Sequence, residues 1–102
     1  MLRSQYNAWL HALATCAILV LAFILKINHS EWCWILLAIM AVWMAEALNT
    51  ALEFLADAAL PQYHPLVQKA KDVAAGAVLI SAIGAVVIGI LIFAPYLAHH
   101  VR

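Results

Sequence analysis

The stretch WCWILLAIMAVWMAEALNTALEFLADAAL, residues 32–60, is long and apolar and contains no glycine or proline. As an α-helix at about 1.5 Å per residue it would extend about 43 Å, which exceeds the hydrocarbon core of about 30 Å. Trp32 and Trp34 at its start are typical of a membrane interface. We therefore predict a membrane-spanning helix whose far end projects beyond the hydrocarbon.

Four polar side chains interrupt this stretch at helical spacing. They are Glu46, Asn49, Glu53 and Asp57. At about 100° per residue the three carboxylates fall within about 20° of one line, and the amide lies about 60° from it. A carboxylate at membrane depth is costly, so this polar stripe must face protein, water or an ion. We expect Lys69 and Lys71 to be the partners of Glu46, because an antiparallel hairpin would return both lysines towards the carboxylates.

The composition of the whole chain also favours a membrane protein. Of its 102 residues 69% are hydrophobic and 10% are charged, and the mean hydropathy is +1.02. A chain of this size cannot bury so much apolar surface in one small soluble core. Residues 1–102 are therefore predicted to form a single membrane domain. The formal net charge of +0 gives no reason to expect a nucleic-acid partner.

Two more apolar runs flank the central stretch. We predict span one over about 6–26, span two over about 32–60 and span three over about 67–97, with a loop over about 61–66. The predicted fold is all-α, with three transmembrane helices per chain. Glycines and alanines in span three are expected to let neighbouring helices approach closely. Lysine and arginine are slightly more numerous on the side of the 61–66 loop, so the positive-inside rule places that loop in the cytosol.

The polar stripe and the lysines together indicate a chemistry. Carboxylates beside lysines, with an amide between them, supply what phosphoryl transfer requires: oxygen ligands for Mg²⁺, cations for phosphates and a carboxylate that takes a hydroxyl proton. The same spacing fits a cation or proton pathway built on Glu46, or a structural scaffold. Periodicity alone therefore leaves enzyme, transporter and scaffold open.

Two strings in the sequence carry a family resemblance. AEALNTALEFLAD, residues 45–57, and YHPLVQKAKDVAAGAVL, residues 63–79, resemble the prokaryotic diacylglycerol kinase and undecaprenol kinase family of small three-span membrane enzymes. The resemblance implies a homotrimeric helical bundle in the bacterial cytoplasmic membrane. Its active sites would form at subunit interfaces facing the cytosol, where ATP and Mg²⁺ phosphorylate the hydroxyl of a membrane lipid.

The resemblance also implies roles for the residues of the stripe. Glu46 would be the general base on the lipid hydroxyl. Asn49 would orient the lipid or the nucleotide, and Glu53 would bind the Mg²⁺ that bridges the nucleotide phosphates. Asp57 would have a lesser, positioning role.

Residues beyond the stripe would complete the nucleotide site. Lys71 would hold the phosphates, Asp72 would support nucleotide binding, and His64 would lie near the adenine. In the N-terminal segment QYNAWLH, Asn7 has a supporting role and Gln5 stands where the family has a metal-binding glutamate. An amide is a weaker magnesium ligand than a carboxylate. His11 in the same segment is expected to be a packed or interfacial polar residue.

The resemblance favours one lipid over another. Residues 63–79 look more like the undecaprenol kinase branch, so undecaprenol is the expected substrate and diacylglycerol comes next. Two alternatives remain. Gln5 is compatible with a catalytically weak or dead relative that acts as a trimeric scaffold, and Glu46 with a small cation- or proton-coupled transporter subunit.

Overall fold

A computed structural model of the chain describes the backbone of residues 2–101 and the side chains of residues 8–99. It contains three α-helices, α1 (Leu2–Leu25), α2 (His29–Ala59) and α3 (Pro65–Val101). Each is long and apolar enough to cross a membrane, as judged by length and composition. The predicted all-α chain with three membrane-length helices is therefore confirmed.

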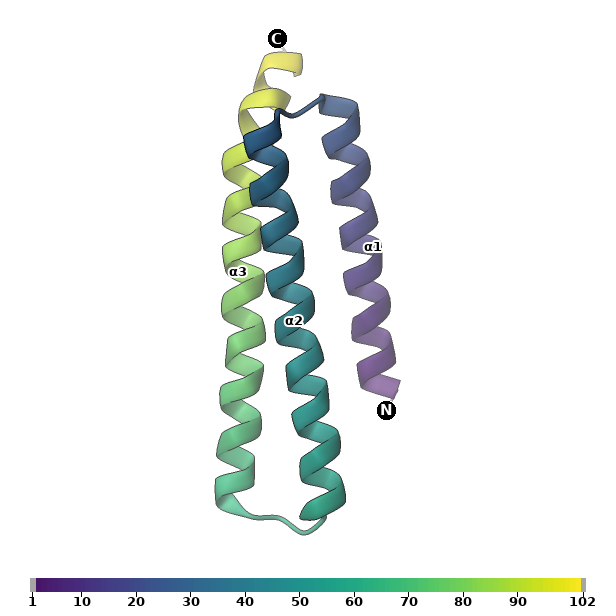
Figure 1. Cartoon of the computed structure of the whole chain (residues 1–102), viewed down its shortest axis with the longest axis vertical. Helices are drawn as coiled ribbons and strands as arrows, with labels where there is room; N and C mark the ends of the chain where they lie inside the picture. Colours follow the sequence, from purple (N-terminus) through teal and green to yellow (C-terminus); the bar gives the residue numbers. More distant parts are fainter. Residues whose placement is uncertain (1, 102) are drawn as a thin grey trace.

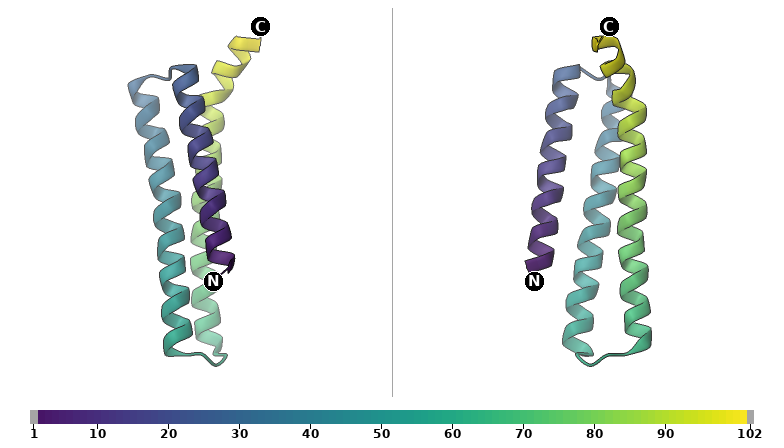
Figure 2. Two further views of the ribbon diagram at one scale, coloured as in Figure 1. Left: turned by 90° about the vertical axis from the view of Figure 1, so that its right-hand side faces the viewer. Right: turned by 180° about the vertical axis from the view of Figure 1, so that it is seen from behind.

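The three helices form an elongated bundle of 57 × 22 × 21 Å. α2 and α3 pack against each other as an antiparallel hairpin, and α1 runs antiparallel to α2 with far fewer contacts (Figure 1). The N-terminus and the α2–α3 loop lie towards one end, whereas the C-terminus and the α1–α2 turn lie at the other (Figure 1). The loop-side ends of α2 and α3 extend beyond α1 (Figure 2).

Local hydrogen bonds close the turn between α1 and α2. Lys26 adopts a positive φ of 54°, and its N–H donates to the Phe23 carbonyl at 3.3 Å. The Ile27 N–H donates to the Ala22 carbonyl at 3.4 Å. This is the Schellman pattern that ends many helices, and the burial of both Ile27 and Ala22 adds its usual apolar contact.

α2 begins at His29, earlier than the predicted start at Trp32, because Asn28 caps it. The Asn28 side chain accepts a hydrogen bond from the Glu31 N–H at 2.9 Å. The Glu31 carboxylate accepts one from the Asn28 N–H at 3.0 Å. This capping box satisfies two donors around the helix start and fixes where the helix begins.

The apolar core lies near the α1–α2 turn, away from the polar stripe. Its buried members are Ala22, Leu25, Ile27, Ile35, Ile92 and Phe93. Most other large apolar side chains among residues 8–99 are exposed on the single chain. The glycines of α3 do not mediate close packing within the chain, since a Cβ at any of them would meet nothing within 4 Å. The expected role of glycine in close helix packing is therefore wrong within one chain.

The far end of α3 deviates from the axis of the bundle. Pro95 lies inside this helix, where it removes one backbone hydrogen bond and clashes with the preceding turn. The last turns of α3 bend away from the other helices (Figure 2). A proline is a recognised cause of such a bend.

Candidate functional site

At the α1–α2 turn the Tyr96 hydroxyl of α3 donates to Glu31, which also accepts from the Asn28 N–H. Farther from this turn, polar side chains form two groups at different heights of the bundle. The deep cluster consists of His11, Thr15, Trp43 and Glu46. The loop-end cluster consists of Asp57, Gln68, Lys71 and Asp72. Between Glu46 and Asp57 the rise along α2 is about 16 Å, so the two clusters are separate.

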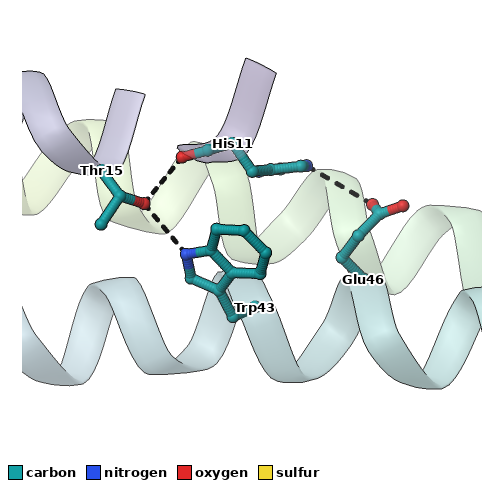
Figure 3. Close-up of polar contacts among 4 residues, drawn as sticks. All are labelled: His11, Thr15, Trp43 and Glu46. Carbon is teal, nitrogen blue, oxygen red and sulfur yellow. Dashed lines mark hydrogen bonds and ion pairs between the residues drawn. The ribbon is translucent and has the colours of Figure 1, made fainter. Parts of the chain in front are cut away.

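The deep cluster joins α1 to α2 around the Glu46 carboxylate (Figure 3). Nε2 of His11 lies 3.5 Å from Oε2 of Glu46. The two side chains are only 22% and 12% exposed. A carboxylate so far from water needs a partner with a positive or donor group, and His11 supplies it.

Thr15 and Trp43 complete the deep cluster beside this pair. The Trp43 indole N–H donates to Oγ1 of Thr15 at 2.9 Å. The Thr15 hydroxyl in turn donates to the main-chain carbonyl of His11 at 2.7 Å. The rings of His11 and Trp43 are tilted, with centroids 5.9 Å apart. Polar side chains of α1 and α2 thus connect these two helices within the deep cluster.

The expected pairing of Glu46 with the lysines is wrong. Lys71 Nζ instead lies 2.9 Å from Oδ1 of Asp57, near the loop, and Lys69 is exposed. The α2–α3 hairpin sets this pairing, since residues close to the loop on one helix face residues close to it on the other. Lys71 therefore meets the outermost carboxylate of the stripe and does not reach the innermost one.

The loop-end cluster is open to solvent. The side chain of Asp57 is 66% exposed and that of Lys71 is 25% exposed. Glu53 also interacts electrostatically with Lys71. One turn away, the Gln68 amide donates to Oδ1 of Asp72 at 3.0 Å. A cation flanked by carboxylates at a solvent-exposed helix end is chemically suited to bind phosphate groups together with a metal.

His64 caps α3. Its Nδ1 accepts a hydrogen bond from the Leu66 N–H at 3.1 Å, and its carbonyl accepts one from the Gln68 N–H at 3.0 Å. Pro65 occupies the first helical position, where the missing N–H costs nothing. His64 therefore has a structural function beside the nucleotide-binding role that the sequence suggests.

Asn49 and Glu53 lie between the two clusters. Oδ1 of Asn49 is buried without a hydrogen-bond partner among the described residues. It borders a shallow apolar depression whose far wall includes Ala74 and Ala77 of α3. Leaving a buried acceptor unpaired costs about 1–3 kcal/mol, so this amide is ready to accept a donor from another group. Glu53 is half-buried, one helical turn closer to the loop.

The donor set for a metal can be tested against the described side chains. Among residues 8–99 no three His, Cys, Asp or Glu side chains converge on one point. Mg²⁺ is commonly held by one or two carboxylates together with substrate phosphates, and Glu53 beside Lys71 fits that mode. Gln5 and Asn7 have their side chains outside the described residues, so the structure does not place them against Glu53.

Sequence reasoning missed His11 as the partner of Glu46. A signal was present, because His11 precedes the polar turn over 26–31 by as many residues as Glu46 follows it. In an antiparallel hairpin, positions equidistant from the turn lie opposite each other. Counting outwards from the turn would have placed the imidazole beside the carboxylate.

An apolar groove of about 730 Å³ runs along the three helices towards the α1–α2 turn. His11, Thr15 and Trp43 form part of its wall, so it meets the deep cluster. Aliphatic residues make up most of the remainder, including Ile39 and Val86. An apolar chain is the chemical class of ligand that fits such a lining.

Comparison with known proteins gives consistent matches. The family model described as "Prokaryotic diacylglycerol kinase" matches residues 1–93. An undecaprenol kinase from Bacillus subtilis (strain 168) is 42% identical over 95 residues, which cover 93% of this chain and 77% of that protein. A diacylglycerol kinase from Synechocystis sp. (strain ATCC 27184 / PCC 6803 / Kazusa) is 38% identical over 93 residues, or 90% of this chain and 53% of that protein. No solved structure matches the chain.

Proposed function

Because this chain belongs to the prokaryotic diacylglycerol kinase family, we propose that it transfers the γ-phosphate of ATP to the hydroxyl of a membrane lipid. Undecaprenol is the favoured lipid and diacylglycerol the next, because the match to the Bacillus undecaprenol kinase covers most of both chains. The family match does not favour a transporter or a non-catalytic scaffold.

One observation carries the proposal most directly. Glu46 is a nearly buried carboxylate at membrane depth, whereas the Asp57–Lys71 pair on the same hairpin is open to solvent. A lipid hydroxyl lies at the membrane interface and ATP lies in water. A helix that carries a base at one height and a phosphate-binding cation at the other serves both substrates.

The proposed reaction uses this chain's side chains in three steps. Lys71 holds the ATP phosphates, and Asp72 supports nucleotide binding next to it. Glu46 accepts the proton of the lipid hydroxyl as its oxygen attacks the γ-phosphorus. The new O–P bond forms while the bond from the γ-phosphorus to the bridging oxygen breaks, and ADP leaves with that electron pair. Asn49 orients the lipid headgroup through its amide.

Glu53 is the carboxylate proposed to hold Mg²⁺, with the phosphates as its other ligands. The ion would neutralise charge on the phosphate oxygens. Gln5 is proposed to contribute a neutral amide oxygen where a carboxylate would bind more strongly.

The chain is proposed to work as a homotrimer in the bacterial cytoplasmic membrane, with its α2–α3 loop in the cytosol. Two features support assembly. Most large apolar side chains among residues 8–99 are exposed on one chain, and Glu46 and Lys71 belong to separate clusters. A second copy that brings its loop-end cluster towards Glu46 would unite the base with the phosphate-binding lysine.

Transfer of labelled γ-phosphate tests the proposal. Purified protein in mixed micelles would receive magnesium ATP with undecaprenol or diacylglycerol, in parallel. We expect label in undecaprenol above diacylglycerol, and loss of at least about 100-fold in Glu46→Gln. Glu31→Gln is the matched control, because it makes the same change at the start of α2, far from Glu46, and its amide oxygen can still accept from the Asn28 N–H and the Tyr96 hydroxyl. Full activity in Glu46→Gln, or no label in either lipid, would refute the proposal.

A further inference from the structure

We propose that His11 is a positioning residue for the general base Glu46. The inference rests on the proposed function, but its geometric part does not. Nε2 of His11 faces Oε2 of Glu46 at 3.5 Å. With Oε2 facing the imidazole, Oε1 is the oxygen left to accept the proton of the lipid hydroxyl.

His11 is the group that this chain offers for the task. Between Asp72 and His99, α3 carries no Asp, Glu, Lys, Arg or His. Within residues 8–25 of α1, His11 is the one side chain of these five types. The lysines lie at the loop end, where Asp57 engages Lys71. Among the side chains of residues 8–99, the ionisable partner that the chain offers Glu46 at this depth is therefore the imidazole.

The surroundings hold the imidazole in place. Trp43 precedes Glu46 by one helical turn, so both project from the same face of α2. The Trp43 ring lies against the His11 ring, and its indole N–H holds Thr15 on the next turn of α1 (Figure 3). His11 is thus placed between the indole and the carboxylate.

This arrangement has a consequence for catalysis. A glutamate side chain has three rotatable bonds, and an unheld carboxylate samples orientations in which neither oxygen points at the substrate. Fixing one oxygen restricts the other, and misplacement of a reacting group by about 1 Å costs about 100-fold in rate. His11 should therefore affect turnover and leave ATP binding alone, because Lys71 and Asp72 lie in the other cluster.

Two substitutions at His11 separate positioning from packing. His11→Leu fills similar space with an apolar side chain that has no hydrogen-bond donor. His11→Gln retains an N–H donor. We expect His11→Leu to lower kcat about 10- to 100-fold with the KM for ATP unchanged, and His11→Gln to stay within about fivefold of the parent chain. The exposed His29→Gln is the control. Unchanged kcat in His11→Leu, or an equal loss in both His11 variants, would overturn the assignment.

A second measurement does not depend on kinase activity. The hydrophobic reagent dicyclohexylcarbodiimide modifies protonated carboxyl groups at membrane depth, and peptide mass spectrometry locates the adduct. Because Nε2 of His11 faces Oε2 of Glu46 at 3.5 Å, replacing the imidazole with leucine uncovers that oxygen, so His11→Leu should label Glu46 several-fold faster than the parent chain, and His11→Gln at close to the parent rate. Equal rates in all three would overturn the contact. Faster labelling in a chain that phosphorylates no lipid would refute the kinase and keep the contact.

Discussion

Glu46 and Asp57 lie on one face of α2 but in different surroundings. Glu46 is 12% exposed and faces His11, whereas Asp57 is 66% exposed and faces Lys71. Desolvation raises the cost of leaving the first unpaired, and water screens the second. Identical chemistry at helical spacing therefore fits the two different roles that we propose for these carboxylates, a base for Glu46 and a guide for the phosphate-binding Lys71 for Asp57.

The exposed pair yields a prediction at the residue scale. Asp57→Asn should change the free energy of unfolding by less than about 1 kcal/mol, since exposed ion pairs contribute little. It should raise the KM for ATP a few-fold, because Lys71 loses the group that orients it. Unfolding in detergent and steady-state kinetics over a range of ATP concentrations measure the two effects.

The comparison variant is Glu31→Gln, which neutralises a carboxylate at the other end of α2. It should leave the KM for ATP unchanged. A lower kcat with an unchanged KM in Asp57→Asn would assign Asp57 to the chemical step and contradict a role through Lys71.

Element ends decide how the loop-end cluster is built. α3 begins directly after the proline-rich loop, and His64 caps it through Nδ1 while Pro65 fills the first position. The helix start places Gln68, Lys71 and Asp72 within its first two turns. The start of α3, which carries the residues that we propose bind the nucleotide, is therefore capped by a histidine that the resemblance also puts near the adenine.

Substitutions at His64 separate these two functions. His64→Ala should destabilise the chain by about 1 kcal/mol through loss of the cap, whereas His64→Asn should keep the cap and the stability. If His64 also contacts the nucleotide, both variants should raise the KM for ATP. Thermal unfolding in micelles and ATP kinetics give the two values. A normal KM in His64→Asn would show that capping alone explains this residue.

On the scale of the whole molecule, one chain is incomplete in two respects. Its large apolar side chains are mostly exposed among residues 8–99, and its two polar clusters do not meet. A bilayer can cover the exposed apolar helix faces without a partner chain, since lipid tails pack against them. The separation of the two polar clusters favours a site shared between copies.

Mixing two inactive variants tests the shared site. Glu46→Gln and Lys71→Met would each be inactive alone, but a mixed assembly can combine an intact Glu46 from one copy with an intact Lys71 from another. Equal mixing should restore about a quarter of the parent activity in a ring of identical interfaces. Assembly from co-expressed chains with distinct tags allows the measurement. No recovery in verified mixed assemblies would place both residues of each site on one chain.

Much of the fold was predictable from the order of residues alone. Apolar runs longer than the hydrocarbon core, a polar six-residue turn and a loop bracketed by prolines are local signals, and they determined three antiparallel helices and a membrane protein. The helical spacing of Glu46, Asn49, Glu53 and Asp57 determined a polar stripe. The strings around that stripe also sufficed to indicate the family.

Only the tertiary structure decided which charges meet. The prediction that Lys69 or Lys71 pairs with Glu46 failed because it used the hairpin only to return the lysines to α2 and left out the register, which determines the residue that each lysine meets. One hairpin sets Asp57 opposite Lys71, and the other sets Glu46 opposite His11. Helical periodicity is a property of one segment and fixes a side chain's direction around its own axis. Which residue of a neighbouring helix that side chain meets depends on the geometry of the turn and on helix packing, and neither is a property of one segment.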